Sequence, residues 1–252
     1  MNIGLIIALV ALLLVLILGY NIMLQYKLKA EATRRQESAR YVALIDATEE
    51  LISGASYLPY SKELMLCLHN RILDALMNMH ELDPKNKHLV QRVESAKGQV
   101  QQIQDSYEGN DATSFKVPTS DKQAIIMLKL VKRLRDTVRT EHNKGRMDTQ
   151  SYMVENARLE TIQIRINIEN VVKRAHESIA KGQPGTAAQL LKKGIDALST
   201  KNDNYSMQAK EKLSEMLEQL QNSRQAKAEE KQQTNRERDD DINALFGEKK
   251  KW

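Results

Sequence analysis

The chain has 252 residues, with 38 Lys and Arg against 33 Asp and Glu, and a formal net charge of +5. Aromatic residues make up only 4% of it, and it has 10 glycines and 4 prolines, a composition that favours an all-helical protein over one built from sheets. Its one cysteine, Cys67, excludes a small secreted domain held together by disulfides.

An apolar run opens the chain. From Ile3 to Leu24 it holds 22 residues and one strongly polar side chain, Asn21, and the first charged residue is Lys27. A helix of this length rises about 33 Å, enough to cross the hydrocarbon core of a bilayer. A cleaved signal peptide would instead have a basic start, a shorter apolar core and a small-residue cleavage site. We therefore expect residues 1–26 to form a single transmembrane anchor.

The charges that follow this run predict its orientation. Four basic residues lie shortly after it, namely Lys27, Lys29, Arg34 and Arg35. Basic residues favour the cytoplasmic side, so we expect the amino terminus outside and the large carboxyl-terminal part in the cytoplasm, at a cytoplasmic (inner) membrane. A free thiol at Cys67 agrees with a reducing compartment, and we interpret it as a small buried residue of a helix rather than a nucleophile.

The next segments predict helices by their apolar spacing. Residues 27–56 are expected to be a juxtamembrane helix that continues the anchor and ends at Gly54. A helix capped by Ser61 follows, running to about Glu81. Its inward stripe is Leu64, Leu68, Ile72, Leu76 and Met79. Residues 87–107 carry a heptad pattern typical of a coiled coil, but so short a one favours an intramolecular helix pair. Its members are Leu89, Val93, Ala96, Val100, Ile103 and Tyr107.

Four more helices complete the expected hairpin domain, residues 61–221. Ser120 is suited to cap a helix that reaches about Asn143. The inward residues expected for it are Ile125, Leu128, Val131, Leu134 and Val138. A long helix over residues 148–181 is apolar on more than one face and should be covered from two sides. Helices over 186–199 and 205–221 follow. Short connections between them predict an antiparallel bundle of stacked α-hairpins.

The end of the chain changes character twice. Residues 222–241 have no apolar side chains except two alanines, which predicts either a solvated extension of the last helix or a flexible charged linker, and we expect the linker. Residues 242–252 then form a terminal interaction peptide. In one or two helical turns Ile242, Leu245 and Phe246 share a face, led by Asp241 and followed by lysines. We expect these four residues to bind a partner; docking onto the chain's own bundle, or a frayed end, are the alternatives.

No catalytic signature is found in the sequence. It has neither a glycine-rich phosphate loop nor a His-Glu-x-x-His motif, and its five histidines lie far apart. Few aromatic residues and few glycines argue against a sculpted small-molecule pocket. We therefore expect no enzyme activity, no catalytic residues, no metal and no cofactor.

A basic face on the fourth helix of the bundle offers an alternative function. Lys129, Lys132, Arg133 and Arg139 could follow a phosphate backbone or an anionic membrane. Acidic residues are interspersed on this helix and aromatic residues for base stacking are missing, so an ordinary solvated surface is the preferred interpretation. Nucleic-acid or anionic-lipid binding remains the second hypothesis.

Two helical segments resemble parts of a tetratricopeptide unit. LMNMHELDPKN (Leu76–Asn86) is similar to the end of such a unit with its terminal proline, and TAAQLLKKGIDAL (Thr186–Leu198) is similar to its second helix. No 34-residue period links the two segments. The resemblance implies stacked, TPR-like α-hairpins rather than a repeat array.

The terminal segment DDINALFG (Asp240–Gly247) resembles two bacterial peptides. One is the short amino-terminal peptide of flagellar motor switch proteins, which binds the phosphorylated chemotaxis response regulator. By that resemblance Ile242, Leu245 and Phe246 are anchors and Asp241 is the acidic lead. The other is the carboxyl-terminal peptide of the bacterial division tubulin homologue. Both resemblances imply a protein partner in motility, polarity or division.

These observations combine into one expectation. The chain is a membrane-anchored, non-enzymatic adaptor or scaffold that recruits protein partners through its helical surface and its carboxyl-terminal peptide. Its partner, and whether it forms an oligomer, stay open.

Overall fold

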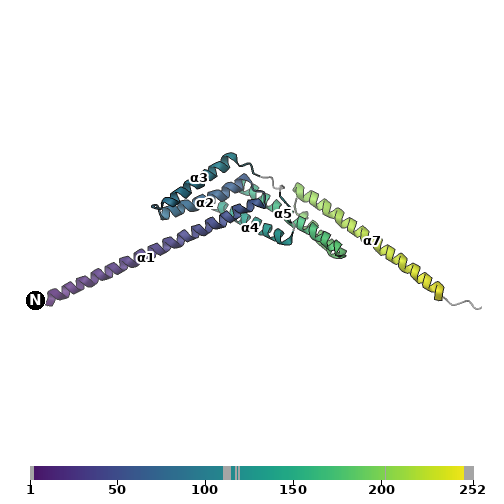
Figure 1. Ribbon diagram of the computed structural model, residues 1–252, viewed down its shortest axis with the longest axis horizontal. Coiled ribbons are helices and arrows are strands. Elements are labelled where there is room, and N and C mark those ends of the chain that lie inside the picture. The colour runs from purple at the N-terminus through teal and green to yellow at the C-terminus, as the bar shows by residue number, and fades with distance from the viewer. Residues whose placement is uncertain (1–2, 110–114, 117, 119, 202, 247–252) are drawn as a thin grey trace, which may run out of the picture. The chain divides into compact units, whose positions relative to one another are not determined.

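The computed structural model describes residues 3–109, 115–116, 118, 120–201 and 203–246 (Figure 1). All regular secondary structure in these residues is helical, as the composition predicts. The helices are α1 (Ile3–Ser53), the 3-10 turn η1 (Gly54–Ser56), α2 (Lys62–Leu82), α3 (Lys87–Ser106), α4 (Asp121–Asn143), α5 (Thr149–Ala180), α6 (Pro184–Ser199) and α7 (Asn204–Phe246).

The chain divides into two compact units. Unit 1 comprises Met1–Phe115 and Arg133–Asn156, and unit 2 comprises Lys116–Lys132 and Ala157–Trp252. The boundary therefore falls inside α4 and inside α5, so each of these helices contributes residues to both units. The region expected to form one hairpin domain, residues 61–221, is likewise shared between the two.

Helix α1 is continuous over 51 residues, as expected for an anchor that runs into a juxtamembrane helix. Among the described residues it is the one helix long and apolar enough to span a membrane, judged by length and composition alone. Near its other end Ile45, Thr48 and Leu51 are buried in unit 1. One unbroken helix thus carries both the apolar run and part of the core of unit 1.

Side-chain caps begin two helices where the sequence predicts them, at Ser61 and Ser120, and a third helix begins with a cap at Asp148 that was not predicted. The Ser61 hydroxyl accepts a hydrogen bond from the Leu64 amide at 3.0 Å, and the Ser120 hydroxyl accepts one from the Gln123 amide at 3.2 Å. The Asp148 carboxylate accepts one from the Ser151 amide at 2.9 Å. Each of these bonds satisfies an amide that has no carbonyl partner in the first helical turn.

Glycine ends two of the helices in the left-handed backbone conformation. Gly145 has φ +73° after α4, and Gly182 has φ +71° after α5. After α4 the Gly145 amide donates to the His142 carbonyl and the Arg146 amide to the Glu141 carbonyl, which is the Schellman pattern. A residue with a Cβ is strained at such an angle, so these turns depend on glycine.

The inward face of α4 differs from the prediction. Ile125 was expected to face inward but is 53% exposed. The buried apolar positions are Ala124, Met127, Val131, Leu134 and Val138. Their 3-4-3-4 spacing keeps one face of the helix, whereas Ile125 lies about 100° around the axis from Ala124. The prediction favoured Ile125 because its side chain is larger, but the structure buries the small Ala124 instead.

Helix α5 is buried on two faces, as predicted. Ile166 and Ile168 both lie in the interior although they stand about 200° apart around the helix axis. In unit 2 Ile168 packs with apolar residues of α6 and α7. The residues of this cluster are Ile168, Ala175, Ala187, Ala188, Leu191, Leu198, Leu213 and Leu220. A Cβ on Gly194 would lie only 2.9 Å from Leu213 Cδ1, so the helices approach closely there.

The charged segment is helical, which corrects the expectation of a flexible linker over residues 222–241. Helix α7 continues through it to Phe246, and residues 221–238 are all exposed. The sequence contains no glycine or proline from Ile195 to Phe246, and the segment is rich in Ala, Glu, Lys, Gln and Arg. These residues have the highest helix propensities, so the helix persists without a core to pack against.

Candidate functional site: a groove between α1, α2 and α3

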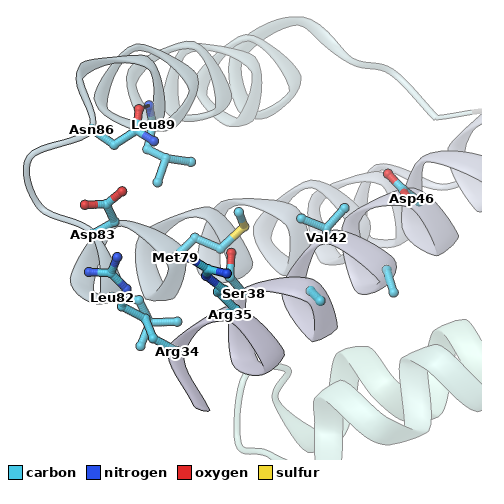
Figure 2. Close-up of a pocket in the computed structure, with 12 residues that line it drawn as sticks. Arg34, Arg35, Ser38, Val42, Asp46, Met79, Leu82, Asp83, Asn86 and Leu89 are labelled. Atoms are coloured by element: carbon cyan, nitrogen blue, oxygen red, sulfur yellow. Dashed lines mark hydrogen bonds between the residues drawn. The ribbon is translucent and has the colours of Figure 1, made fainter. Parts of the chain in front are cut away.

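Three helices of unit 1 form a groove of about 600 Å³ (Figure 2). One wall is α1 and the other is the end of α2 with the start of α3. The groove is lined by Arg34, Arg35, Ser38, Ala39, Val42, Ala43 and Asp46 of α1, and by Met79, Leu82, Asp83, Asn86 and Leu89.

A tight turn between α2 and α3 shapes one end of this groove. The Asp83 amide donates to the Met79 and His80 carbonyls and ends α2, and Pro84 prevents the helix from continuing. The Asn86 side chain then accepts hydrogen bonds from the first amides of α3, those of His88 and Leu89. The turn therefore brings the last turn of α2 and the first turn of α3 to the same end of the groove.

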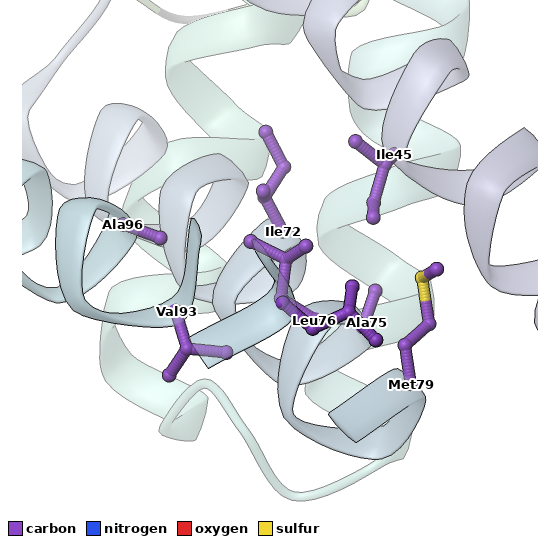
Figure 3. Close-up of a cluster of buried hydrophobic side chains, with 8 residues drawn as sticks. Ile45, Ile72, Ala75, Leu76, Met79, Val93 and Ala96 are labelled. Carbon is purple, nitrogen blue, oxygen red and sulfur yellow. The ribbon is translucent and has the colours of Figure 1, made fainter. Parts of the chain in front are cut away.

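A packed hydrophobic cluster forms the floor (Figure 3). Ile45 of α1 faces Ile72 and Leu76 of α2, and Val93 and Ala96 of α3 close the cluster from the other side. Met79 and Leu89 belong both to this cluster and to the groove lining. Because the floor is part of the core, the apolar surface of the groove is held in place by close packing.

The two ends of the groove carry opposite net charges. Arg34, Arg35 and Asp83 lie at the Leu82 end, where the two arginines outnumber the one carboxylate, and Asp46 lies beyond Val42 (Figure 2). Arg34 makes no ion pair within the described residues, and Arg35 makes only a long one, 3.9 Å to Glu31. Twelve residues of helix separate Arg34 from Asp46, which is about 18 Å. Between these charges Val42 remains 41% exposed.

A buried carboxylate joins α2 to the end of α4. Glu141 is 2% exposed and accepts hydrogen bonds from Arg71, Lys144 and Arg146. Arg146 also pairs with Asp74 of α2 at 2.8 Å. Burial by itself raises the pKa of Glu141, but the hydrogen bonds from Arg146 and Lys144 and the charge of Arg71 outweigh it and hold the pKa below the ordinary 4.5. This cluster is structural in character, since cations surround the one buried carboxylate.

Two more polar contacts tie unit 1 together. The fully buried Tyr60 donates its hydroxyl to the Leu51 carbonyl at 2.5 Å, and burial raises the pKa of Tyr60. The Ser61 hydroxyl, besides capping α2, donates to the buried Glu155 carboxylate at 2.6 Å. These bonds hold the end of α1 against the start of α2, and the start of α2 against α5.

Cys67 lies half-buried on α2. Burial raises the pKa of its thiol to about 12, so it is almost entirely protonated at neutral pH. This environment is that of an unreactive thiol rather than a nucleophile, in agreement with the interpretation from the sequence.

The basic residues predicted on α4 share one side of that helix, but one of them, Arg133, is paired with a carboxylate. Lys129, Lys132 and Arg139 are exposed. The Arg133 guanidinium instead donates to both carboxylate oxygens of Glu50 on α1, at 2.7 and 2.8 Å. Hydrogen bonding and the positive charge of Arg133 lower the pKa of Glu50. Arg133 therefore serves as an internal contact of unit 1.

The predicted partner-binding residues lie at the end of α7. The helix backbone includes Asp241, Ile242, Leu245 and Phe246, but their side chains, and all of residues 247–252, lie outside the described part. On a helical backbone the spacing of the three apolar residues puts them on one face.

Sequence reasoning did not find the groove or the Glu141 cluster. It used Arg34 and Arg35 only to predict the orientation of the membrane anchor. The available signal was the LDP turn ending α2, which brings Leu82 and Leu89 close together in space. In the described part of the chain no group of three or more His, Cys, Asp or Glu is placed to hold a metal ion.

Comparisons of the chain with models of protein families, with curated proteins and with solved structures found no match. The tetratricopeptide, motor-switch and division-protein resemblances of the sequence stay predictions.

Proposed function

We propose that this chain is a single-pass membrane protein that acts as a non-enzymatic adaptor. Its apolar amino-terminal run crosses the membrane with the amino terminus outside, and its helical part lies in the cytoplasm. There it recruits a protein partner through its helical surface and its carboxyl-terminal peptide. The resemblances of that peptide favour a bacterial inner membrane and a role in motility, polarity or division.

The continuity of α1 is the observation that carries this proposal. The same helix supplies the apolar run and the core residues Ile45, Thr48 and Leu51 of unit 1. No loop separates them, so a membrane-embedded run holds unit 1 close to the bilayer. A binding surface fixed in this way meets membrane-bound or membrane-proximal partners at a raised effective concentration.

Helix α7 supports the assignment of the tail as a binding peptide. After Leu220, the last residue of the α6–α7 cluster, the helix continues for 26 residues to Phe246, about 39 Å. Apolar residues return only at its end, after a long solvated stretch. Such an end presents its apolar face to a partner rather than to its own helix neighbours.

A comparative pull-down tests the proposal. Tagged full-length protein is purified from detergent-solubilised membranes beside the same chain truncated after Arg238. We expect at least one partner to be captured by the full chain and lost with the truncation, while both forms still fractionate with membranes. Identical partners for the two forms would overturn the role of the tail.

A charge-reversal variant separates this proposal from the alternative function. Lys129→Glu with Lys132→Glu and Arg139→Glu removes the exposed basic residues of α4 but spares Arg133, which pairs with Glu50. If the chain is an adaptor, we expect this variant to capture the tail-dependent partner as well as the unchanged protein does. Loss of capture with the tail intact would favour the nucleic-acid or anionic-lipid hypothesis.

A further inference from the structure

The groove between α1, α2 and α3 has the features of a site for an amphipathic peptide. Its apolar part is incompletely covered, because Val42, which lines it together with Met79 and Leu89, remains exposed. Its two ends differ in net charge, with Arg34 and Arg35 beside Asp83 at one end and Asp46 at the other. A ligand that fits both properties has acidic residues, then apolar anchors, then basic residues, over about 18 Å.

The carboxyl-terminal segment of this chain has that order. Asp239, Asp240 and Asp241 come first, the anchors Ile242, Leu245 and Phe246 follow, and Lys249, Lys250 and Lys251 come last. From Asp240 to Phe246 the helix backbone rises about 9 Å, and the first of the lysines follows three residues later in the sequence. Laid parallel to α1, it places its acids against the arginines and its lysines against Asp46.

The stiffness of α7 favours docking onto another molecule. The helix has no glycine or proline between its last core residue, Leu220, and Phe246. An unbroken helix cannot fold back onto the surface from which it emerges, so its tip is carried away from the cluster that ends at Leu220. Copies anchored in one membrane lie close together, which raises the effective concentration of one chain's tip for another's groove.

We propose that residues 239–252 of a second copy of this chain dock in the groove between α1, α2 and α3. This inference rests on the proposed function, because it names one partner for the terminal peptide. The contact joins different surfaces of the two copies, so it is heterologous and can extend from copy to copy along the membrane.

Cysteine cross-linking in the intact protein tests the docking. In a Cys67→Ser background, one full-length copy carries Val42→Cys and a differently tagged copy carries Leu245→Cys, and both are expressed together in membranes. Val42 is exposed, so the substitution spares the core. After mild oxidation we expect a covalent dimer that contains both tags. The matched control is Glu37→Cys, exposed on α1 outside the groove, which should give at least tenfold less cross-link.

Charge reversal in the same assay tests the complementarity. Arg34→Glu with Arg35→Glu should lower the yield of cross-link at least tenfold, and Asp240→Lys with Asp241→Lys in the other copy should restore it. The matched control is Arg40→Glu, an exposed residue of α1 that does not line the groove, and it should have no effect. If the aspartate-to-lysine changes restore the cross-link, the loss caused by the arginine-to-glutamate changes cannot be a merely structural effect.

Three results would overturn the inference. They are equal cross-linking at the control position, insensitivity to charge reversal, and the absence of any covalent dimer that contains both tags. The pull-down keeps the two proposals separate. If the tail captures another protein but never cross-links to the groove, this inference fails and the adaptor proposal stands.

Discussion

Glu141 shows how a single buried charge can organise a helix end. It lies on the inward face of α4, one turn beyond Val138, at a position where the 3-4 pattern would place an apolar residue. Arg71, Lys144 and Arg146 surround it with positive charge. An isolated carboxylate would be too costly to bury there, so the burial depends on these partners.

Glu141→Gln should lower the free energy of unfolding by about 3 kcal/mol, near the lower end of the range for breaking a buried ion pair. Because the folded pKa lies below the ordinary 4.5, the stabilisation by the charge is complete above about pH 4.5 and is lost as pH falls through the folded pKa. Denaturant unfolding followed by circular dichroism at several pH values measures this.

The wild-type and Glu141→Gln curves should therefore converge in acid. Glu49→Gln, an exposed position of α1, is the control and should behave as wild type. A constant difference between the Glu141→Gln variant and wild type at every pH would show that the charge is not the stabilising feature.

At the scale of helices, short-range signals decide where each element begins and ends. Ser61, Ser120 and Asp148 cap helices, and Gly145 and Gly182 end them. These signals act through backbone hydrogen bonds within a few residues, so they can be predicted without knowledge of the fold. The absence of any glycine or proline between Ile195 and Phe246 likewise explains why α7 continues.

Two glycine-to-alanine changes should have opposite effects. Gly145→Ala forces a Cβ into the left-handed conformation at the end of α4 and should destabilise unit 1 by about 1 kcal/mol. Gly98→Ala, within α3 and with open space around its Cβ position, should stabilise by about 0.5–1 kcal/mol. Thermal unfolding of the two variants beside wild type compares them directly. A gain in stability from Gly145→Ala would contradict the assigned turn.

At the scale of the whole molecule, α1 links the apolar run to the core of unit 1 in one helix. The exposed apolar side chains of its first half are explained if lipid surrounds them. The basic residues that follow would then lie on the cytoplasmic side, and the groove would begin about 15 Å beyond the end of the apolar run at Leu24.

Reporter fusions test this topology. A reporter active only in the cytoplasm, fused after Trp252, should be active, and one active only outside should be silent. Reversing Lys27, Lys29, Arg34 and Arg35 to Glu should weaken this preference, because basic flanks set the orientation. The protein should also stay in the membrane pellet after alkaline extraction. Recovery in the supernatant would contradict the anchor.

Much of the architecture follows from the sequence alone. The helical class, the continuity of α1, the caps and the two-sided burial of α5 are encoded in composition, local hydrogen bonding and apolar spacing. The same reasoning failed where two local choices were close in energy. Ile125 and Ala124 are adjacent in the sequence, and the apolar spacing allows either to face inward. The charged part of α7 is polar enough to predict disorder and also rich enough in helix-forming residues to predict a helix.

Only the tertiary structure decided which distant residues meet. It brought Arg34 and Val42 of α1 beside Met79 of α2 and Leu89 of α3 to form the groove, and it placed Arg71 next to Glu141. It also used Arg133 as a partner for Glu50, where the sequence offered only a charged face. Local patterns fix which face of a helix is apolar or charged, whereas the pairing of faces depends on packing among all the helices of a unit at once.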